Sequence, residues 1–111
     1  MAAIFLDAGA MSARLDVETP VNAGDGQGGV IPGFAPVTTL WARVEPLSMN
    51  DEEQADEAKS AVTHRIIVRY RDDLRAGMRF RNGSRLFMIV ALGDPDETRR
   101  YIDCRCREEI R

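Results

Sequence analysis

Hydrophobic and polar residues alternate in several short segments of this 111-residue chain. Successive side chains of a β-strand point to opposite faces, so this alternation predicts strands with one buried face. The predicted strands cover residues 14–19, 38–45, 64–71, 78–81, 85–92 and 100–108. The positions expected to face inward are Leu15, Val17, Leu40, Ala42, Val44, Ile66, Val68, Tyr70, Ile102, Cys104 and Cys106. About six strands in close succession indicate a mainly β fold, a small antiparallel barrel or sandwich.

Prolines and glycines mark the expected ends of these strands. Pro20 should close the first strand and Pro46 the second, because proline lacks the backbone N–H that a strand ladder needs. The pair Asn82-Gly83, between the fourth and fifth predicted strands, is the strongest hairpin signal in the chain. We expect an N-terminal arm over residues 1–13 and a single barrel domain over residues 14–111.

Two long segments interrupt the strand pattern. Residues 21–36 are rich in glycine and predict a Gly-rich loop, and a loop of this length inside a compact domain is usually functional or disordered. Residues 48–61 form an acidic insertion between the second and third strands. Asn50 and Glu53 have the spacing of a capping box, so we expect a short acidic helix or loop over about residues 49–62.

The net charge of −3 hides an asymmetry between the two halves of the chain. Residues 1–62 carry three basic and ten acidic side chains, whereas residues 63–111 carry twelve basic and eight acidic ones. Such a split favours self-association or docking between surfaces of opposite charge, although two separately solvated faces would give the same counts. No apolar run approaches the ~20 residues of a membrane helix, so no membrane partner is expected. The N-terminus also lacks the basic flank of a secretory signal.

Residue types that usually carry catalysis or bind metals are few and scattered. Cys104 and Cys106 should share one face of a strand, too close together for an ordinary disulfide. With His64 as the one histidine, they supply too few ligands for zinc. The acidic side chains of residues 51–57 share a single polar segment and so lack the two different environments of an acid–base pair. The sequence therefore predicts neither an enzyme nor a cofactor or metal site.

The order of the segments resembles the head–tail joining, or head-closure (stopper), proteins of long-tailed bacteriophages and gene-transfer particles. The resemblance extends over nearly the whole chain from about residue 13. The segments that carry it are ARLDV at 13–17, LWARVEPLS at 40–48, VTHRIIVRYR at 62–71, AGMRF at 76–80, GSRLFMI at 83–89, the DPD turn at 94–96 and CRCRE at 104–108.

The resemblance implies a structural connector of the virion neck, at the head–tail junction, assembled in the bacterial host cytoplasm. Such proteins form a homo-oligomeric ring, expected to be a dodecamer, beneath the portal and its adaptor proteins. Tail-terminator or other tail proteins would bind on the opposite side. Double-stranded DNA would pass through the lumen without sequence-specific binding, and the ring would help to retain packaged DNA.

Three groups of site residues follow. In the family that the chain resembles, the segment between the second and third strands lines the channel, and a ring of carboxylates there would repel DNA phosphates. The channel-lining residues implied in this way are Asp51, Glu52, Glu53, Asp56 and Glu57. We predict subunit contacts at Trp41, Arg43 and Arg69, because aromatic residues and arginine are enriched in interface cores. The predicted contact loop toward the tail or the adaptor consists of Gly24, Asp25, Gly26, Gln27, Gly28 and Gly29.

Three alternatives remain open. The acidic insertion could be merely a solvated face. The chain could be a tail-completion or tail-terminator ring protein of similar size. It could also be a small barrel that binds single-stranded nucleic acid, which would require exposed aromatic side chains beside a basic groove.

Overall fold

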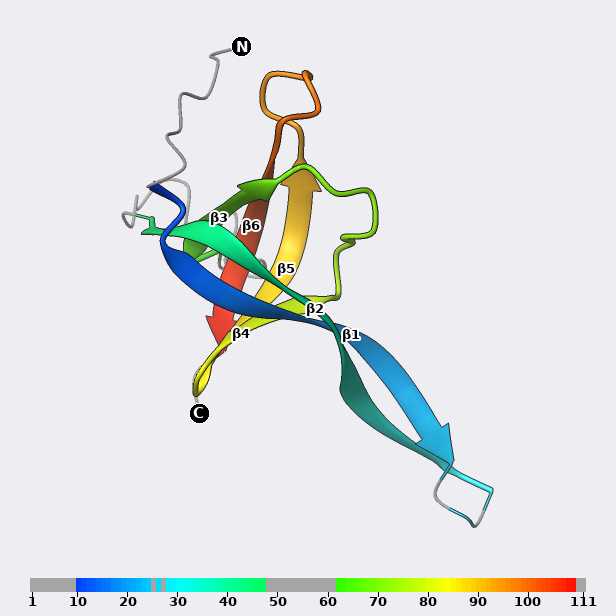
Figure 1. Cartoon of the computed structure of the whole chain (residues 1–111). Helices are drawn as coiled ribbons and strands as arrows, with labels where there is room; N and C mark the ends of the chain where they lie inside the picture. Colours follow the sequence, from blue (N-terminus) through cyan, green and yellow to red (C-terminus); the bar gives the residue numbers. More distant parts are fainter. Residues whose placement is uncertain (1–9, 25, 27, 48–61, 110–111) are drawn as a thin grey trace.

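The computed structural model describes residues 10–24, 26, 28–47 and 62–109. Its strands are β1 Ala13–Gly24, β2 Val30–Pro46, β3 His64–Arg69, β4 Arg79–Asn82, β5 Arg85–Gly93 and β6 Tyr101–Glu109. All neighbouring strands are antiparallel, and the order β1-β2-β3-β6-β5-β4 closes on itself because β4 pairs with β1 (Figure 1). The predicted mainly β fold is confirmed, and the closure shows that it is a barrel. None of the described residues form a helix with the length and apolarity that a membrane crossing needs.

The barrel interior is filled by one face of each strand. The fully buried side chains are Leu15, Val17, Ala42, Ile66, Val68, Phe80, Phe87, Cys104 and Cys106. They belong to one continuous hydrophobic cluster, against which Leu40 and Val44 pack from β2. In a small closed barrel the inward side chains fill the interior. Seven of these nine are alternate residues that the pattern predicted, and Phe80 and Phe87 are additional.

β1 and β2 continue beyond the barrel wall as a two-stranded ribbon, which we call the hairpin extension (residues 19–24 and 30–37). β1 pairs with β4 only over residues 16–18, and β2 pairs with β3 only over residues 42–46. The two strands pair with each other, however, as far as Gly24 and Val30. The hairpin extension therefore projects away from the barrel, along a molecule whose longest dimension is 52 Å (Figure 1).

The hairpin extension corrects two predictions. The Gly-rich loop expected over residues 21–36 is wrong for most of its length, and the first strand does not end at Pro20. Pro20 lies inside β1 opposite Phe34. Proline is tolerated in a strand where its nitrogen faces an open edge, and neither edge of this ribbon is paired with another described strand.

Two smaller differences concern the ends of β3 and β4. Tyr70 was expected to face inward, but β3 ends at Arg69 and the Tyr70 side chain is 38% exposed. The hairpin between β4 and β5 is confirmed, although Asn82 still pairs with Arg85 and the turn lies one residue later than expected. Gly83 has a φ of 62°, which is the left-handed conformation that this turn requires.

The acidic insertion at 48–61 and residues 1–9 of the expected N-terminal arm lie outside the described residues. Met11, near the end of that arm, is buried. Pro46 ends β2, as predicted.

Candidate functional site

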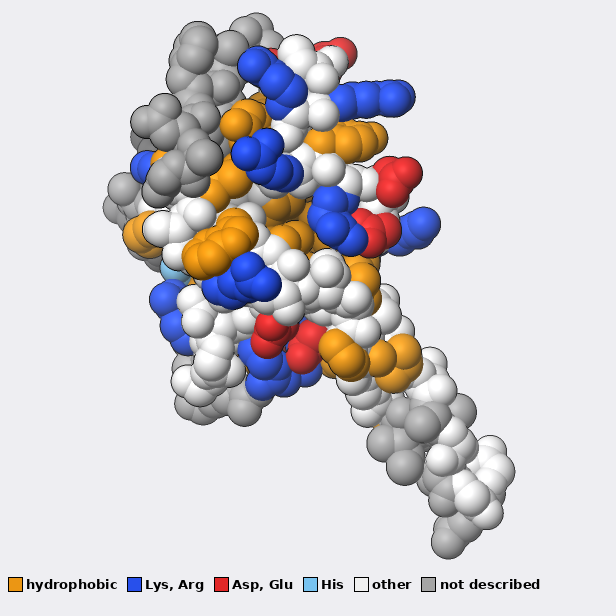
Figure 2. All heavy atoms as spheres, in the orientation of Figure 1, with side chains coloured by type: hydrophobic (Ala, Val, Ile, Leu, Met, Phe, Trp, Pro, Cys, Tyr) orange, Lys and Arg blue, Asp and Glu red, His pale blue; other side chains and the backbone are white. Residues whose placement is uncertain are grey.

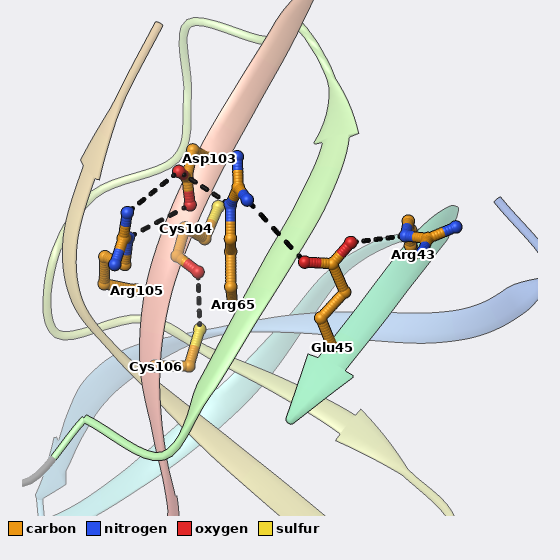
Figure 3. Close-up of polar contacts among 7 residues, drawn as sticks. All are labelled: Arg43, Glu45, Arg65, Asp103, Cys104, Arg105 and Cys106. Carbon is orange, nitrogen blue, oxygen red and sulfur yellow. Dashed lines mark hydrogen bonds and ion pairs between the residues drawn. The ribbon is translucent and has the colours of Figure 1, made fainter. Parts of the chain in front are cut away.

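A ladder of alternating charges crosses the outer face of β2, β3 and β6 (Figure 3). Glu45 lies between Arg43 on its own strand and Arg65 on β3, whose Nη1 is 3.6 Å from the Glu45 carboxylate. Arg65 Nε donates to Asp103 Oδ2 at 2.9 Å, and Arg105 Nε lies 3.3 Å from Asp103 Oδ1. Each acidic group therefore has an arginine on both sides, which ties three strands together across the barrel wall.

The three predicted subunit-contact residues are divided between this ladder and a neighbouring pocket. Arg43 is the end of the ladder. Trp41 and Arg69 instead line a surface pocket of about 240 Å³, together with Met11, Leu40, Tyr70 and Arg71. Trp41 is 51% exposed, and the guanidinium carbon of Arg14 lies 5.1 Å from the centre of its ring. We call this site the Trp41 pocket.

The base of the hairpin extension is held to the barrel by a polar clamp. Glu18 on β1 accepts hydrogen bonds from Arg79 Nε at 2.6 Å and from Arg81 Nε at 2.9 Å, both on β4. The Arg79 guanidinium carbon also lies 3.7 Å from the ring centre of Phe34 on β2. Burial raises the pKa of Glu18, but the hydrogen bonds and charges of Arg81 and Arg79 outweigh burial and hold that pKa below its usual value. Glu18 is therefore ionised in the folded protein near neutral pH.

The predicted contact loop lies at the tip of the hairpin extension. Gly24 is the last residue of β1, and Gly26 and Gly28 have φ values of 83° and 88°. These values suit glycine because other residues rarely adopt them. Asp25 and Gln27 lie outside the described residues.

The connection between β5 and β6 is a compact polar loop over residues 94–100. Asp96 accepts hydrogen bonds from Thr98 and from Arg100 Nη2, while Asp94 Oδ2 accepts one from the Arg99 N–H at 2.7 Å. Glu97 and Arg99 have φ values of 59° and 60°. Non-glycine residues in this conformation are held there by surrounding structure, so this loop has a defined shape.

Burial keeps the two described thiols protonated and unreactive and favours the neutral form of the imidazole. Burial raises the pKa of Cys104 to about 12, and it also raises the pKa of Cys106, so both remain protonated. Burial lowers the pKa of His64, although the nearby Glu108 carboxylate acts in the opposite direction. The His64 ring packs edge-on against Phe87 at 5.0 Å. Among the described residues, no cluster of three or more His, Cys, Asp or Glu could hold a metal ion.

The five residues implied to line the channel, 51–53, 56 and 57, all lie outside the described residues. The surfaces that the structure does describe are built for contact through side chains. They comprise an outer charge ladder, an aromatic pocket with arginines at its rim, and a long projecting hairpin.

Comparison with known proteins identifies the family. A model of the phage head completion protein family matches residues 6–109, which is most of the chain. The chain belongs to the phage head completion protein family. This family is structural rather than catalytic.

Two solved structures are similar to this chain over most of its length. The solution structure of protein SF1141 from Shigella flexneri 2a is similar with a TM-score of 0.69 and 26% identity, over 93% of this chain and 96% of that one. A chain from the virion of a native gene transfer agent particle is similar with a TM-score of 0.62 and 26% identity, over 89% of this chain and 94% of that one. No curated protein matches this chain by sequence. Together, the family and the virion chain support a structural, virion-associated role between head and tail.

Sequence reasoning missed two features of this head completion protein. The charge ladder could have been found from the outward positions 43, 45, 65, 103 and 105, which carry charges of both signs on predicted strands. The hairpin extension could have been found from the near absence of charge over residues 19–37, where Asp25 is the one charged residue. The glycine content of this segment predicts a loop, and only the tip of the extension is one.

Proposed function

We propose that this protein is a head-closure connector, which forms a ring between the portal–adaptor assembly of a DNA-filled head and the tail. The ring, expected to be a dodecamer, would lie in the virion neck after assembly in the host cytoplasm. The observation that carries the proposal is the family match over residues 6–109, together with the fold shared with a virion chain.

The acidic insertion supplies the proposed channel lining. Asp51, Glu52, Glu53, Asp56 and Glu57 lie between β2 and β3 in the sequence, so a ring of subunits would repeat these carboxylates around the lumen. Like charges repel, so the lining would keep DNA phosphates from adhering to the wall while DNA passes or is retained.

The described surfaces supply the proposed protein contacts. Trp41, Arg43 and Arg69 lie on the outer face of β2 and β3, where aromatic and arginine side chains are suited to a subunit interface. The tip of the hairpin extension, from Gly24 to Gly29, would reach the adaptor or a tail protein, because this end of the molecule projects furthest from the barrel (Figure 1).

The first test is deletion of the gene in a producing strain, followed by negative-stain electron microscopy of the lysate. We expect separate DNA-filled or emptied heads and separate complete tails. Joined particles in normal number would contradict the connector. Absent or incomplete tails would favour a tail-completion ring instead.

The channel lining is tested by replacing its five acidic residues with Asn and Gln. A matched control replaces Asp72 and Glu109, which are exposed on the described surface. We expect the first variant to lower the amount of nuclease-protected DNA per particle and the control to leave it unchanged. Equal DNA content in both variants would contradict a role for the insertion in the lumen.

The contact loop is tested by shortening the tip while the rest of the ribbon stays paired. Replacing residues 24–30 by Asn-Gly keeps the Ala23–Ile31 pair, which belongs to the hydrogen-bonded set, and closes it with a favoured two-residue turn. The fold should be retained and the yield of tailed particles should fall. A normal yield would contradict a contact at the tip.

One observation favours a second candidate function, binding of single-stranded nucleic acid. Trp41 and Tyr70 are exposed beside Arg14 and Arg69, and bases stack on exposed aromatic rings that basic residues flank. Salt-dependent binding of short DNA by the purified protein, lost in Trp41→Ala, would support this candidate. The connector predicts little such affinity.

A further inference from the structure

The hairpin extension has the composition of a buried element, although it projects from the barrel. Charged residues make up 30% of the chain, yet Asp25 is the one charged residue between positions 19 and 37. Val21 and Val37 are 40% and 41% exposed. On the visible face of the extension, the described side chains are hydrophobic or uncharged, whereas many charged groups lie among the hydrophobic ones on the barrel (Figure 2). Apolar side chains on a ribbon that remained in water would contribute no burial free energy. A ribbon of two strands is also marginally stable at best by itself.

The edges of the extension are rich in hydrogen-bond acceptors and poor in donors. When two strands pair antiparallel, every second pair of opposite residues exchanges two N–H···O bonds. The residue pairs in between point their N–H and C=O groups away from the partner strand, toward the open edges. Pro20, Pro32 and Pro36 all fall in one set of alternate pairs, Pro20–Phe34, Asn22–Pro32 and Glu18–Pro36. Proline has no N–H, so it cannot belong to a residue pair that exchanges two N–H···O bonds. The set that contains the three prolines is therefore the one whose backbone groups point to the open edges.

The consequence is clearest along β2. Its open edge presents the carbonyls of residues 30, 32, 34 and 36 but N–H groups only at 30 and 34. Proline at an edge prevents another strand from adding there. The extension is therefore suited to a partner that offers side-chain donors and an apolar surface, rather than another strand.

The Trp41 pocket has this complementary chemistry. The Trp41 indole and the Arg69 guanidinium are donors, and arginine has no acceptor at all. No ion pair engages Arg69 within the described residues. Aromatic-lined grooves are the usual binding sites of proline-rich segments, and the pocket has Trp41 and Tyr70 in its wall.

We propose that the hairpin extension of one copy of this protein docks in the Trp41 pocket of the next copy. Val21, Val37 and the prolines of the extension pack on Trp41 and Tyr70, and its edge carbonyls accept hydrogen bonds from Arg69 and the Trp41 indole. The inference rests on the proposed ring and specifies the contact that closes it.

A second copy is the occupant for a geometric reason. The extension and the pocket are different surfaces of one chain, and the extension points away from the barrel that carries the pocket (Figure 1). Contacts between two different surfaces of identical subunits are heterologous, and they generate rings when the rotation closes. The tip, beyond the docked strands, remains free to contact a tail or adaptor protein.

Cysteine crosslinking in assembled particles tests the contact. The native thiols, Cys104 and Cys106, are buried, so introduced cysteines react selectively. The test variant combines Val21→Cys with Tyr70→Cys in the full chain. The matched control combines Val21→Cys with Leu92→Cys, because Leu92 is exposed to a similar degree, 37% against 38% for Tyr70, but lies on β5.

After oxidation with copper phenanthroline, the test variant should give a ladder of multimers on a non-reducing gel. Each single variant and the control should remain monomeric. A second pair, Val37→Cys with Tyr70→Cys, probes the base of the extension. The proposal is overturned if neither pair forms multimers, or if Val21→Cys crosslinks to a different virion protein. The fraction of heads joined to tails in the same samples reports separately on the proposed connector function.

Discussion

Residues 13–18 of β1 lie in the barrel wall, whereas residues 19–24 of the same strand lie in the hairpin extension. In the wall, alternate side chains such as Leu15 and Val17 are fully buried and the others face water. In the extension, Val21 is 40% exposed and charged residues are absent apart from Asp25 at the tip. The barrel buries its apolar residues within one chain, and the extension leaves its apolar residues available to another. If the proposed docking holds, residues 13–18 of β1 serve folding and residues 19–24 of the same strand serve assembly.

The largest expected effect is on the barrel core. Phe80→Ala removes a fully buried side chain and should lower the free energy of unfolding by about 3–5 kcal/mol. Val21→Ala, in the extension, should change it by less than about 0.5 kcal/mol. Urea unfolding followed by far-UV circular dichroism measures both. Similar losses in the two variants would show that the extension belongs to the folding core.

The clamp at the boundary should have the next largest effect. Glu18→Gln removes the ionised acceptor of Arg79 and Arg81 and should cost about 1.5–3 kcal/mol, the range for hydrogen bonds to charged groups.

The same substitution predicts a pH dependence. The folded-state pKa of Glu18 is lowered, so its contribution is complete above the unfolded value of about 4.5 and is lost as the pH falls through the folded value. The difference in stability between the wild type and Glu18→Gln should therefore shrink below pH ~4.5. A difference that is constant from pH 7 to pH 3 would contradict the clamp.

A smaller effect is expected in the β5–β6 loop, which also projects from the barrel but is held by hydrogen bonds to Asp94 and Asp96 within the loop. Glu97 has a φ of 59°, so Glu97→Gly relieves backbone strain and should raise stability by up to about 1 kcal/mol. The control is Thr98→Gly, which removes a hydrogen bond to Asp96 and should destabilise the protein. Thermal unfolding measures whether each variant is more or less stable than the wild type. Destabilisation by Glu97→Gly would show that the backbone at this residue is not strained.

The smallest effect on stability is expected from Pro32→Thr, at most about 1 kcal/mol. This substitution restores an N–H on the open edge of β2 and should increase self-association through edge pairing. Ala35→Thr adds the same side chain at a position whose N–H already points to β1, so its self-association should equal that of the wild type. Sedimentation velocity compares the two variants. Equal association would show that the prolines do not protect the edge.

Most of the barrel could be predicted from the sequence because alternation has a direct physical cause. A strand with one buried face must place apolar residues at every second position, so Leu15, Ala42, Ile66 and Cys104 identified the inward face correctly. Tyr70 followed the same alternation and was wrong, because the strand ended one residue before it. Periodicity identifies a face only while the strand continues.

The hairpin extension could not be predicted in this way because none of its described side chains is fully buried within the chain. Glycine and proline usually break strands, and local sequence does not show that Pro20, Pro32 and Pro36 all fall at outward-facing positions. That information lies in the register between β1 and β2, which pairs positions far apart in the sequence.

For the predicted contact residues too, local sequence predicted exposure, whereas the grouping of the residues depends on strand pairing. An exposed Trp41 followed from its place among charged residues on the outer face of a strand. Its grouping with Arg69 and Tyr70 in one pocket depends on the pairing of β2 with β3 and on where β3 ends. The separation of Arg43 from that pocket, into a ladder with Glu45 and Arg65, depends on the same pairing.

The strand-rich class of this protein, its inward face and its resemblance to head-closure proteins follow from residue types and short spacings along one chain. Three features follow from the folded structure instead: the sheet closes as a barrel, β1 and β2 extend beyond it, and an uncharged ribbon and an arginine-rimmed pocket occupy different surfaces of the molecule. Those features depend on contacts between residues distant in sequence, and the register that creates them is set by the packing of the whole barrel.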